Sequence, residues 1–244
     1  MNQLCKLVAK DPLRPKLGAT WNVAGKAGIT TEEQHILEDA KYGKLALTSD
    51  GKLRYILLNR DIEITTGEAV RAINAAMMEW QTSLGIDFVQ VHAHSLADIK
   101  IQFQSSIENQ IFRDEPNVLA YMYYPIAGAL KGVMMINADY AWTPDGEQKS
   151  GRWIQEKTGR KVQWLDNMYD TWSLFKVTRH ELGHGIGLCH TLLEGHTMSG
   201  NYSKMAKHNT TIDEKRGQAK YGTSKRKQSW LSAMKDRLMR KFGK

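Results

Sequence analysis

Hydrophobic positions recur along the middle of the chain with two different periods. From Gly67 to Leu84 they fall at helical spacing through Val70, Ile73, Met77 and Trp80, which predicts one long amphipathic helix. Short runs rich in β-branched, aliphatic and aromatic residues predict five strands, at Lys52–Asn59, Phe88–Val91, Ile99–Phe103, Val118–Tyr124 and Val133–Ile136. Strands interleaved with long helices predict an α+β fold, in which a twisted mixed sheet packs on helices.

The two ends of the chain differ from this middle. Residues 1–50 hold Pro12, Pro15 and scattered glycines, and then Thr30-Thr31-Glu32-Glu33, a capping signature that begins a helix. We interpret them as an N-terminal extension, either a pro-segment or an accessory unit. Residues 223–244 hold eight Lys or Arg against one Asp, and so carry +7 of the net charge of +8. This basic tail has an amphipathic helical pattern over Ser229–Lys244, which fits a docked helix or contact with an anionic membrane, nucleic acid or an acidic protein.

Length and composition restrict the class of protein. A chain of 244 residues with 41% hydrophobic and 25% charged residues is typical of one globular domain with appendages. We expect neither a signal peptide nor a membrane span, which leaves a cytoplasmic, released or virion-associated location open. The two cysteines, Cys5 and Cys189, cannot form a disulfide framework and fit a reducing compartment. We expect a monomer.

One segment carries candidate metal chemistry: His180-Glu181-Leu182-Gly183-His184-Gly185-Ile186-Gly187-Leu188-Cys189-His190. On a helix, His180 and His184 stand one turn apart on one face and can bind a single ion. Gly187 permits a positive φ, so that the chain can leave the helix and bring in His190 as a third ligand. Three protein ligands leave one position open, which is typical of a catalytic zinc site.

Glu181 is the candidate catalytic residue of this motif. It lies beside the first ligand, where its carboxylate can reach a water molecule at the metal without ligating the metal. A His-Glu-x-x-His pattern alone also occurs on ordinary amphipathic helices, but Gly187 and His190 at their fixed offsets argue against coincidence.

The residues around the motif carry a family resemblance. Met198 follows His190 by eight residues and Tyr202 follows Met198 by four, and a long zinc motif before a methionine turn is the signature of metzincins. Within that clan the chain resembles the matrixins, the matrix-metalloproteinase type. Other similar segments are Ala97–Phe103, Leu119–Pro125, Trp142–Thr143 and Asp213–Gly222. We therefore assign residues 51–222 to a matrixin-like zinc protease domain with an insertion near residues 144–171.

The resemblance implies a fold and a set of roles. The fold is a metzincin-type catalytic domain, a twisted mixed sheet packed on the active-site helix and a second long helix. Met198 would form an apolar floor beneath the metal. Substrate would lie extended along the edge strand Val118–Tyr123 and pair with Leu119 and Ala120. Tyr202 would line the pocket for the side chain that follows the cut bond.

At four places the sequence departs from the matrixin pattern, and these departures limit which metal sites and which regulation the resemblance implies for this chain. Tyr121 and Met135 stand where vertebrate matrixins have histidine ligands of a structural zinc, and Asn137-Ala138-Asp139-Tyr140 replaces an acidic calcium-binding run. We therefore expect one catalytic zinc, and the substitutions argue against a structural zinc and a bound calcium. Cys5 lacks the sequence context of the propeptide cysteine that keeps matrixins latent, so we expect a free thiol there.

Three functions compete at this point. The leading one is a zinc metalloendopeptidase, which hydrolyses internal peptide bonds of a protein or peptide with a water molecule activated by the metal and with Glu181 as general base. The second is a non-enzymatic binding module with a vestigial metal site that acts through the basic tail; an intact Glu181 argues against it. The third is a hydrolase of cell-wall peptide cross-links on the same scaffold.

Overall fold

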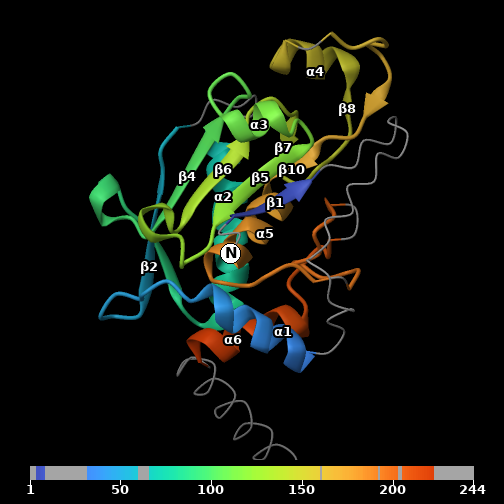
Figure 1. Ribbon diagram of the computed structural model, residues 1–244. Helices are drawn as coiled ribbons and strands as arrows, with labels where there is room; N and C mark the ends of the chain where they lie inside the picture. The colour runs from blue at the N-terminus through green and yellow to red at the C-terminus, as the bar shows by residue number, and fades with distance from the viewer. Residues whose placement is uncertain are drawn as a thin grey trace, which may run out of the picture.

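A six-stranded mixed sheet organises the molecule (Figure 1). The computed structural model describes residues 4–8, 32–59, 66–159, 161–191, 193–202 and 205–222. The strands run in the order β1, β5, β6, β4, β2, β3 across the sheet. Their bounds are Leu4–Val8 for β1, Lys52–Leu57 for β2, Asp87–Gln90 for β3, Ile99–Gln104 for β4, Val118–Tyr123 for β5 and Val133–Asn137 for β6.

Strand direction changes twice toward the side of the sheet that carries the zinc motif. β2 pairs in parallel with β3 and β4, and β4 pairs in parallel with β6. β5 is antiparallel to β6, and β1 is antiparallel to the other side of β5. The edge position expected for Val118–Tyr123 is therefore wrong for this chain. An edge strand presents unpaired backbone groups, and the chain's own residues Leu4–Val8 pair with them.

Two helices pack against each other, and the one that carries His180 and His184 lies next to the sheet. α2 (Thr66–Leu84) lies along α5 (Leu174–Gly185), and α5 also lies against β5. Trp80 of α2 is completely buried, and its indole Nε1 donates a hydrogen bond to the backbone oxygen of Arg179 at 2.8 Å. This contact fixes the zinc helix to the second long helix, as the α+β prediction requires.

The shorter elements connect and cover this core. α6 (Thr211–Tyr221) contacts both α2 and α1 (Glu32–Asp39), and the pair α1 and α6 lies at the lower end of Figure 1. The others are the 3₁₀ turns η1 (Ala40–Tyr42), η2 (His94–Leu96) and η3 (Gly128–Leu130), and the helix α3 (Gln110–Asp114).

Between β7 (Trp142–Thr143) and β10 (Trp172–Ser173) the chain makes an excursion away from the sheet, at the top of Figure 1. It contains α4 (Gly151–Thr158) and an antiparallel pair of two-residue strands, β8 (Lys149–Ser150) and β9 (Met168–Tyr169). β7 and β10 pair in parallel and close the base of the excursion. Residues 144–171 lie between β7 and β10, and the expectation that this stretch is an insertion stays a prediction.

The sequence-based fold prediction is confirmed. The helix over Gly67–Leu84 and all five strands are present, with bounds that differ from the prediction by two residues or fewer. The helix expected in the basic tail falls on residues 223–244, which lie outside the described residues. None of the described helices is long and apolar enough to cross a membrane.

Replacing the buried indole tests the role of the α2–α5 contact. Trp80→Ala should lower the free energy of unfolding by about 3–5 kcal/mol, because it opens a cavity and removes the donor to Arg179. Trp164→Ala, at a side chain that is 59% exposed, should change it by less than about 0.5 kcal/mol. Urea unfolding measures both values, and equal losses in the two variants would contradict the packing described here.

Candidate active site

The end of α5 turns the chain so that the third histidine of the motif faces the first two. Ser173 caps the start of the helix, where its hydroxyl accepts a hydrogen bond from the backbone N–H of Lys176 at 3.1 Å. At the other end, Gly187 has a φ of 93°, and the N–H of Leu188 donates to the oxygen of Gly183 at 2.8 Å. This is a Schellman-type helix end, and it confirms the positive φ expected at Gly187.

Three imidazoles converge at this turn. The Nε2 atom of His180 lies 3.0 Å from that of His184 and 3.0 Å from that of His190, and the latter two are 3.2 Å apart. Four-coordinate zinc with Zn–N bonds of about 2.0–2.1 Å separates its nitrogen ligands by about 3.3–3.4 Å, close to these values. Among the described residues, these three form the one group of three or more His, Cys, Asp or Glu side chains that could hold an ion.

Backbone carbonyls fix the tautomer of two of the imidazole rings. Nδ1 of His180 lies 2.7 Å from the oxygen of Thr197, and Nδ1 of His184 lies 2.7 Å from the oxygen of Leu188. A carbonyl oxygen only accepts, so each Nδ1 carries the proton and each Nε2 of a neutral ring presents a lone pair. Two lone pairs 3.0 Å apart cannot bond to each other. A cation between them satisfies both, so the residues present fit a zinc ion.

Burial keeps these rings neutral. It lowers the pKa of His180 to about 4, and it lowers the pKa values of His184 and His190 well below the usual range. Neutral imidazole is the form that binds a metal.

Glu181 is completely buried beside these rings. Neither of its carboxylate oxygens has a hydrogen-bond partner within the part of the chain that the structure describes. Burial therefore raises its pKa well above the ordinary value of a glutamate. Burying a carboxylate without a hydrogen-bond partner lowers the stability of the fold. Such a group therefore points to a functional role, in which the carboxylate interacts with a ligand.

Comparison with known protein families matches residues 47–221 to the matrixin family, over more than half of the chain. The chain belongs to the matrixin family. Matrixins are zinc metalloendopeptidases, so the resemblance seen in the sequence is confirmed at the level of the family.

Individual relatives agree with this assignment. Karilysin of Tannerella forsythia is 25% identical over 179 residues, which cover 72% of this chain and 32% of karilysin. Human neutrophil collagenase is 27% identical over 153 residues, which cover 62% of this chain and 27% of the collagenase. Matrix metalloproteinase-C of Caenorhabditis elegans is 28% identical over 170 residues, 66% of this chain and 26% of that protein. The matched region thus spans about a third or less of each relative.

In this matrixin, Met198 packs directly under the zinc helix. It is completely buried, and a Cβ on Gly183 would lie 2.2 Å from its sulfur atom. The backbone oxygen of Met198 accepts a hydrogen bond from Thr191, and Thr197 just before it provides the carbonyl that orients His180. The methionine turn therefore both fills the space below the helix and fixes one ring of the motif.

Tyr202 lies at the start of the zinc helix. Its hydroxyl accepts a hydrogen bond from the N–H of Ser173 at 2.9 Å, and its ring packs edge-on against Trp172 at 4.8 Å. Lys176 Nζ lies 4.5 Å from the centre of the same ring. These contacts anchor α5, and the expected role of Tyr202 in a substrate pocket stays a prediction.

Leu119 and Ala120, the expected substrate-binding residues, lie in β5 with β1 on their outer side. Both are completely buried. Leu7 is the register partner of Ala120, and the register shifts between Leu7 and Val8, opposite Leu119. β1 also approaches α5 (Figure 1). The strand from the N-terminal extension therefore occupies the position in which an extended substrate was expected.

Packing occupies the two positions at which vertebrate matrixins bind a structural zinc. Tyr121 of β5 and Met135 of β6 are cross-strand partners and pack in one apolar cluster with Phe112. The hydroxyl of Tyr121 accepts a hydrogen bond from Asn109 Nδ2 at 2.8 Å, and burial raises the pKa of this tyrosine to about 12. Tyr121 and Met135 thus lie in apolar packing, and the expected absence of a structural zinc stays a prediction.

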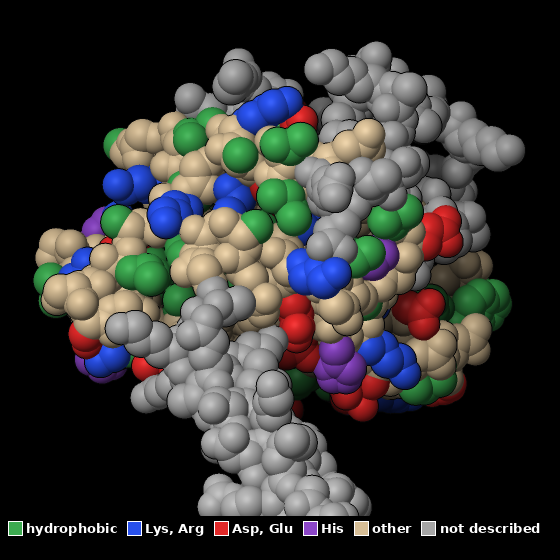
Figure 2. Space-filling model, turned by 90° about the horizontal axis from the view of Figure 1, so that it is seen from below, with side chains coloured by type: hydrophobic (Ala, Val, Ile, Leu, Met, Phe, Trp, Pro, Cys, Tyr) green, Lys and Arg blue, Asp and Glu red, His purple; other side chains and the backbone are tan. Residues whose placement is uncertain are grey.

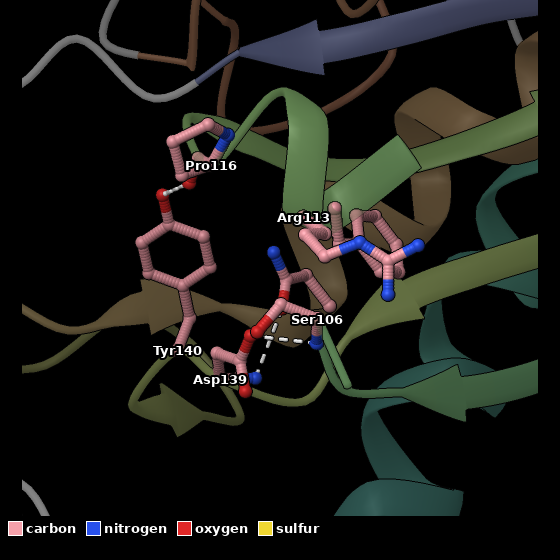
Figure 3. Close-up of a pocket in the computed structure, with 7 residues that line it drawn as sticks. Ser106, Arg113, Pro116, Asp139 and Tyr140 are labelled. Carbon is pink, nitrogen blue, oxygen red and sulfur yellow. Dashed lines mark hydrogen bonds between the residues drawn. The ribbon is translucent and has the colours of Figure 1, made fainter. Parts of the chain in front are cut away.

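A hollow beside residues 137–140 is separate from the zinc motif. Figure 3 shows Asp139 accepting a hydrogen bond from the backbone N–H of Ser106 at 2.8 Å, and the Tyr140 hydroxyl donating to the oxygen of Pro116 at 2.6 Å. Arg113 also lines the hollow. The polar groups of this loop are thus used to tie it to the turns that precede β5.

The sequence did not reveal the charged residues outside the motif that hydrogen-bond to its backbone and to the backbone of the methionine turn. Asp213 of α6 accepts a hydrogen bond from the N–H of Thr197 at 3.0 Å, and so supports the carbonyl that orients His180. Its capping box with Thr210 was a visible signal, because Thr210 and Asp213 have the required spacing. Asp39 and Arg216 also reach the motif, and neither has a local sequence signal.

Surface charge does not mark a second site on the face shown in Figure 2. Lys, Arg, Asp and Glu side chains all occur across the part of this face that the structure describes. The basic tail lies outside the described residues, so its expected contact with a membrane, nucleic acid or an acidic protein stays a prediction.

The turn at Gly187 provides a direct test of the motif's geometry. Gly187→Ala places a Cβ 2.2 Å from the oxygen of Gly43 in addition to straining a residue with φ of 93°. Gly159→Ala is the matched control, because Gly159 has φ of 67° and open space around its Cβ position. We expect a loss of about 1–2 kcal/mol in the free energy of unfolding for Gly159→Ala and a larger loss for Gly187→Ala. Similar losses in both would show that Gly43 does not lie against this turn.

Proposed function

We propose that this matrixin is an active zinc-dependent endopeptidase with Glu181 as its general base. The observation that carries the proposal is the buried, unpartnered carboxylate of Glu181 beside three imidazoles whose Nε2 lone pairs converge. His180, His184 and His190 would hold one zinc ion, and Met198 would pack beneath them.

The zinc ion that these rings would hold would supply Lewis-acid chemistry, activating a water molecule and polarising the carbonyl group of the bond to be cut. The Glu181 carboxylate would accept a proton from the attacking water molecule as the oxygen atom of that water bonds to the carbonyl carbon. The carboxyl group then delivers the proton to the departing amine nitrogen as the C–N bond breaks. The dry surroundings that raise its pKa favour this intermediate protonated state.

The substrate would be an extended peptide paired with the backbone of β5 along Leu119 and Ala120. Residues Leu4–Val8 already form such a pairing, antiparallel to β5. We therefore interpret β1 as a pro-segment strand that must leave before a substrate can bind. The thiol of Cys5 is not needed to block the substrate, because the backbone of β1 alone takes up the pairing positions along β5.

Replacing the proposed base separates chemistry from metal binding. Glu181→Gln keeps the shape of the side chain but cannot accept the proton, so the cleavage rate of a peptide library should fall by about 10²–10⁴-fold. Bound zinc, measured by metal analysis, should stay at the wild-type level because Glu181 is not a ligand. Glu156→Gln, at an exposed position on α4, is the matched control and should cleave like the wild type.

Two outcomes would count against the proposal. Equal and measurable cleavage rates with Glu181 and with Glu181→Gln, in the wild-type chain or in the β1 variant described next, would exclude Glu181 as the base. Absence of chelator-sensitive cleavage in zinc-loaded wild type, and also in the β1 variant described next, would exclude an endopeptidase and favour a binding module.

Breaking the β1 ladder tests the pro-segment. Backbone hydrogen bonds in an antiparallel pair alternate along the strand, so proline at both Lys6 and Leu7 removes at least one N–H donor to β5 whichever residue carries it. The proline pair should raise the rate of peptide cleavage at least several-fold. Alanine at the same two positions keeps the main chain and should give a smaller rise. An unchanged rate in the proline pair would show that β1 does not obstruct substrate.

A further inference from the structure

Asp39, the last residue of α1, is buried against the zinc motif although the family match begins at residue 47. It forms a two-pronged ion pair with Arg216 of α6. Arg216 Nε donates to Asp39 Oδ2 at 2.8 Å, and Nη2 donates to Oδ1 at 2.7 Å. The side chain of Arg216 is 0% exposed and that of Asp39 is 1% exposed.

This ion pair holds both peptide groups of the residue before the third histidine. The N–H of Cys189 donates to Asp39 Oδ1 at 2.8 Å, and the oxygen of Cys189 accepts from Arg216 Nη2 at 2.7 Å. His190 follows directly, so the orientation of its backbone depends on how Cys189 is held. Two charged groups from elements 177 residues apart thus meet on one residue of the motif.

The residues just after Asp39 contact the motif at two further places. A Cβ atom added to Gly187 would lie only 2.2 Å from the backbone oxygen of Gly43. Residues 39–43 therefore pack against the turn that ends the zinc helix. Lys220 Nζ donates to the oxygens of both Asp39 and Gly43, at 2.5 and 2.6 Å, and ties the segment to α6.

Stacked rings provide the other contact. The ring of Tyr42 stacks on that of Tyr124 with centroids 4.2 Å apart, and Tyr124 packs edge-on against His184 at 5.4 Å. Residues 39–43 therefore reach the turn at Gly187, the peptide groups of Cys189 and, through Tyr124, the ring of His184.

Stability alone is a weak reason for a buried ion pair at this place. Removing two charges from water is costly, and an apolar pair of similar volume is often as stable or more stable. The planar guanidinium of Arg216 instead fixes orientation. Its N–H donors bind the Asp39 carboxylate and the backbone oxygen of Cys189 in fixed directions.

We propose that residues 39–43 are a brace of the zinc site, and that Asp39 and Arg216 are positioning residues that set the zinc affinity by orienting His190. The proposal rests on the zinc site proposed above. The proposal gives two parts of the N-terminal extension different roles. β1 blocks the β5 strand at which substrate would bind, and residues 39–43 support the zinc ligands. Groups that orient metal ligands typically contribute 10- to 100-fold to metal affinity.

The test compares the same substitution at two ion pairs of the full-length protein. Asp39→Asn removes the charge that holds Arg216. Asp98→Asn is the matched control, because Arg54 binds Asp98 with the same two-pronged geometry, at 3.0 Å for both contacts, and neither residue touches the motif. Zinc affinity is measured by competition with a chromogenic chelator, and ligand geometry by the visible spectrum of the cobalt-loaded protein.

We expect Asp39→Asn to weaken zinc binding at least about tenfold and to change the cobalt spectrum, while Asp98→Asn stays within about twofold of wild type with the wild-type spectrum. A double variant, Asp39→Leu with Arg216→Met, guards against a folding defect, since an apolar pair replaces the buried charges. It should fold and show the same loss of affinity.

Wild-type zinc affinity and an unchanged cobalt spectrum in either brace variant would overturn the proposal and leave the zinc site intact. An equal loss in Asp98→Asn would also overturn it, because a general loss of stability would then explain the effect. Failure of wild type itself to bind zinc would instead overturn the proposed function.

Discussion

The structure depends on two hydrogen bonds from imidazole to backbone, His180 to Thr197 and His184 to Leu188. Each bond fixes the proton on Nδ1 and leaves a lone pair on Nε2, and the fold places these lone pairs 3.0 Å apart in a buried position. That arrangement is unfavourable without a cation. In the proposed function, the free energy of metal binding there would compensate for burying three rings and the carboxylate of Glu181.

The other elements can be understood by how they hold those two carbonyls and the third ring. Met198 and Asp213 fix the position of Thr197, and the Schellman turn at Gly187 fixes Leu188. Trp80 holds the zinc helix against α2. Beyond these, the proposed brace would hold Cys189 and so orient His190, which would make part of the N-terminal extension necessary for the metal site.

The sequence was sufficient for features whose signal is local. Helical and strand periodicity located α2 and five strands, and the spacing from His180 to His190 identified three rings that the fold does bring together. Contacts between distant segments leave no such pattern, which is why the meeting of Asp39 with Arg216 and the pairing of Leu4–Val8 with β5 were missed. β1 is a run of five residues too short for periodicity to reveal its partner.

X-ray absorption at the zinc edge of the purified, zinc-loaded protein tests the central claim most directly. The claim predicts one zinc per chain with three imidazole nitrogens at about 2.0–2.1 Å and a light fourth ligand. A sulfur ligand at about 2.3 Å, fewer than three imidazoles, or zinc that fails to bind in a one-to-one ratio would contradict it.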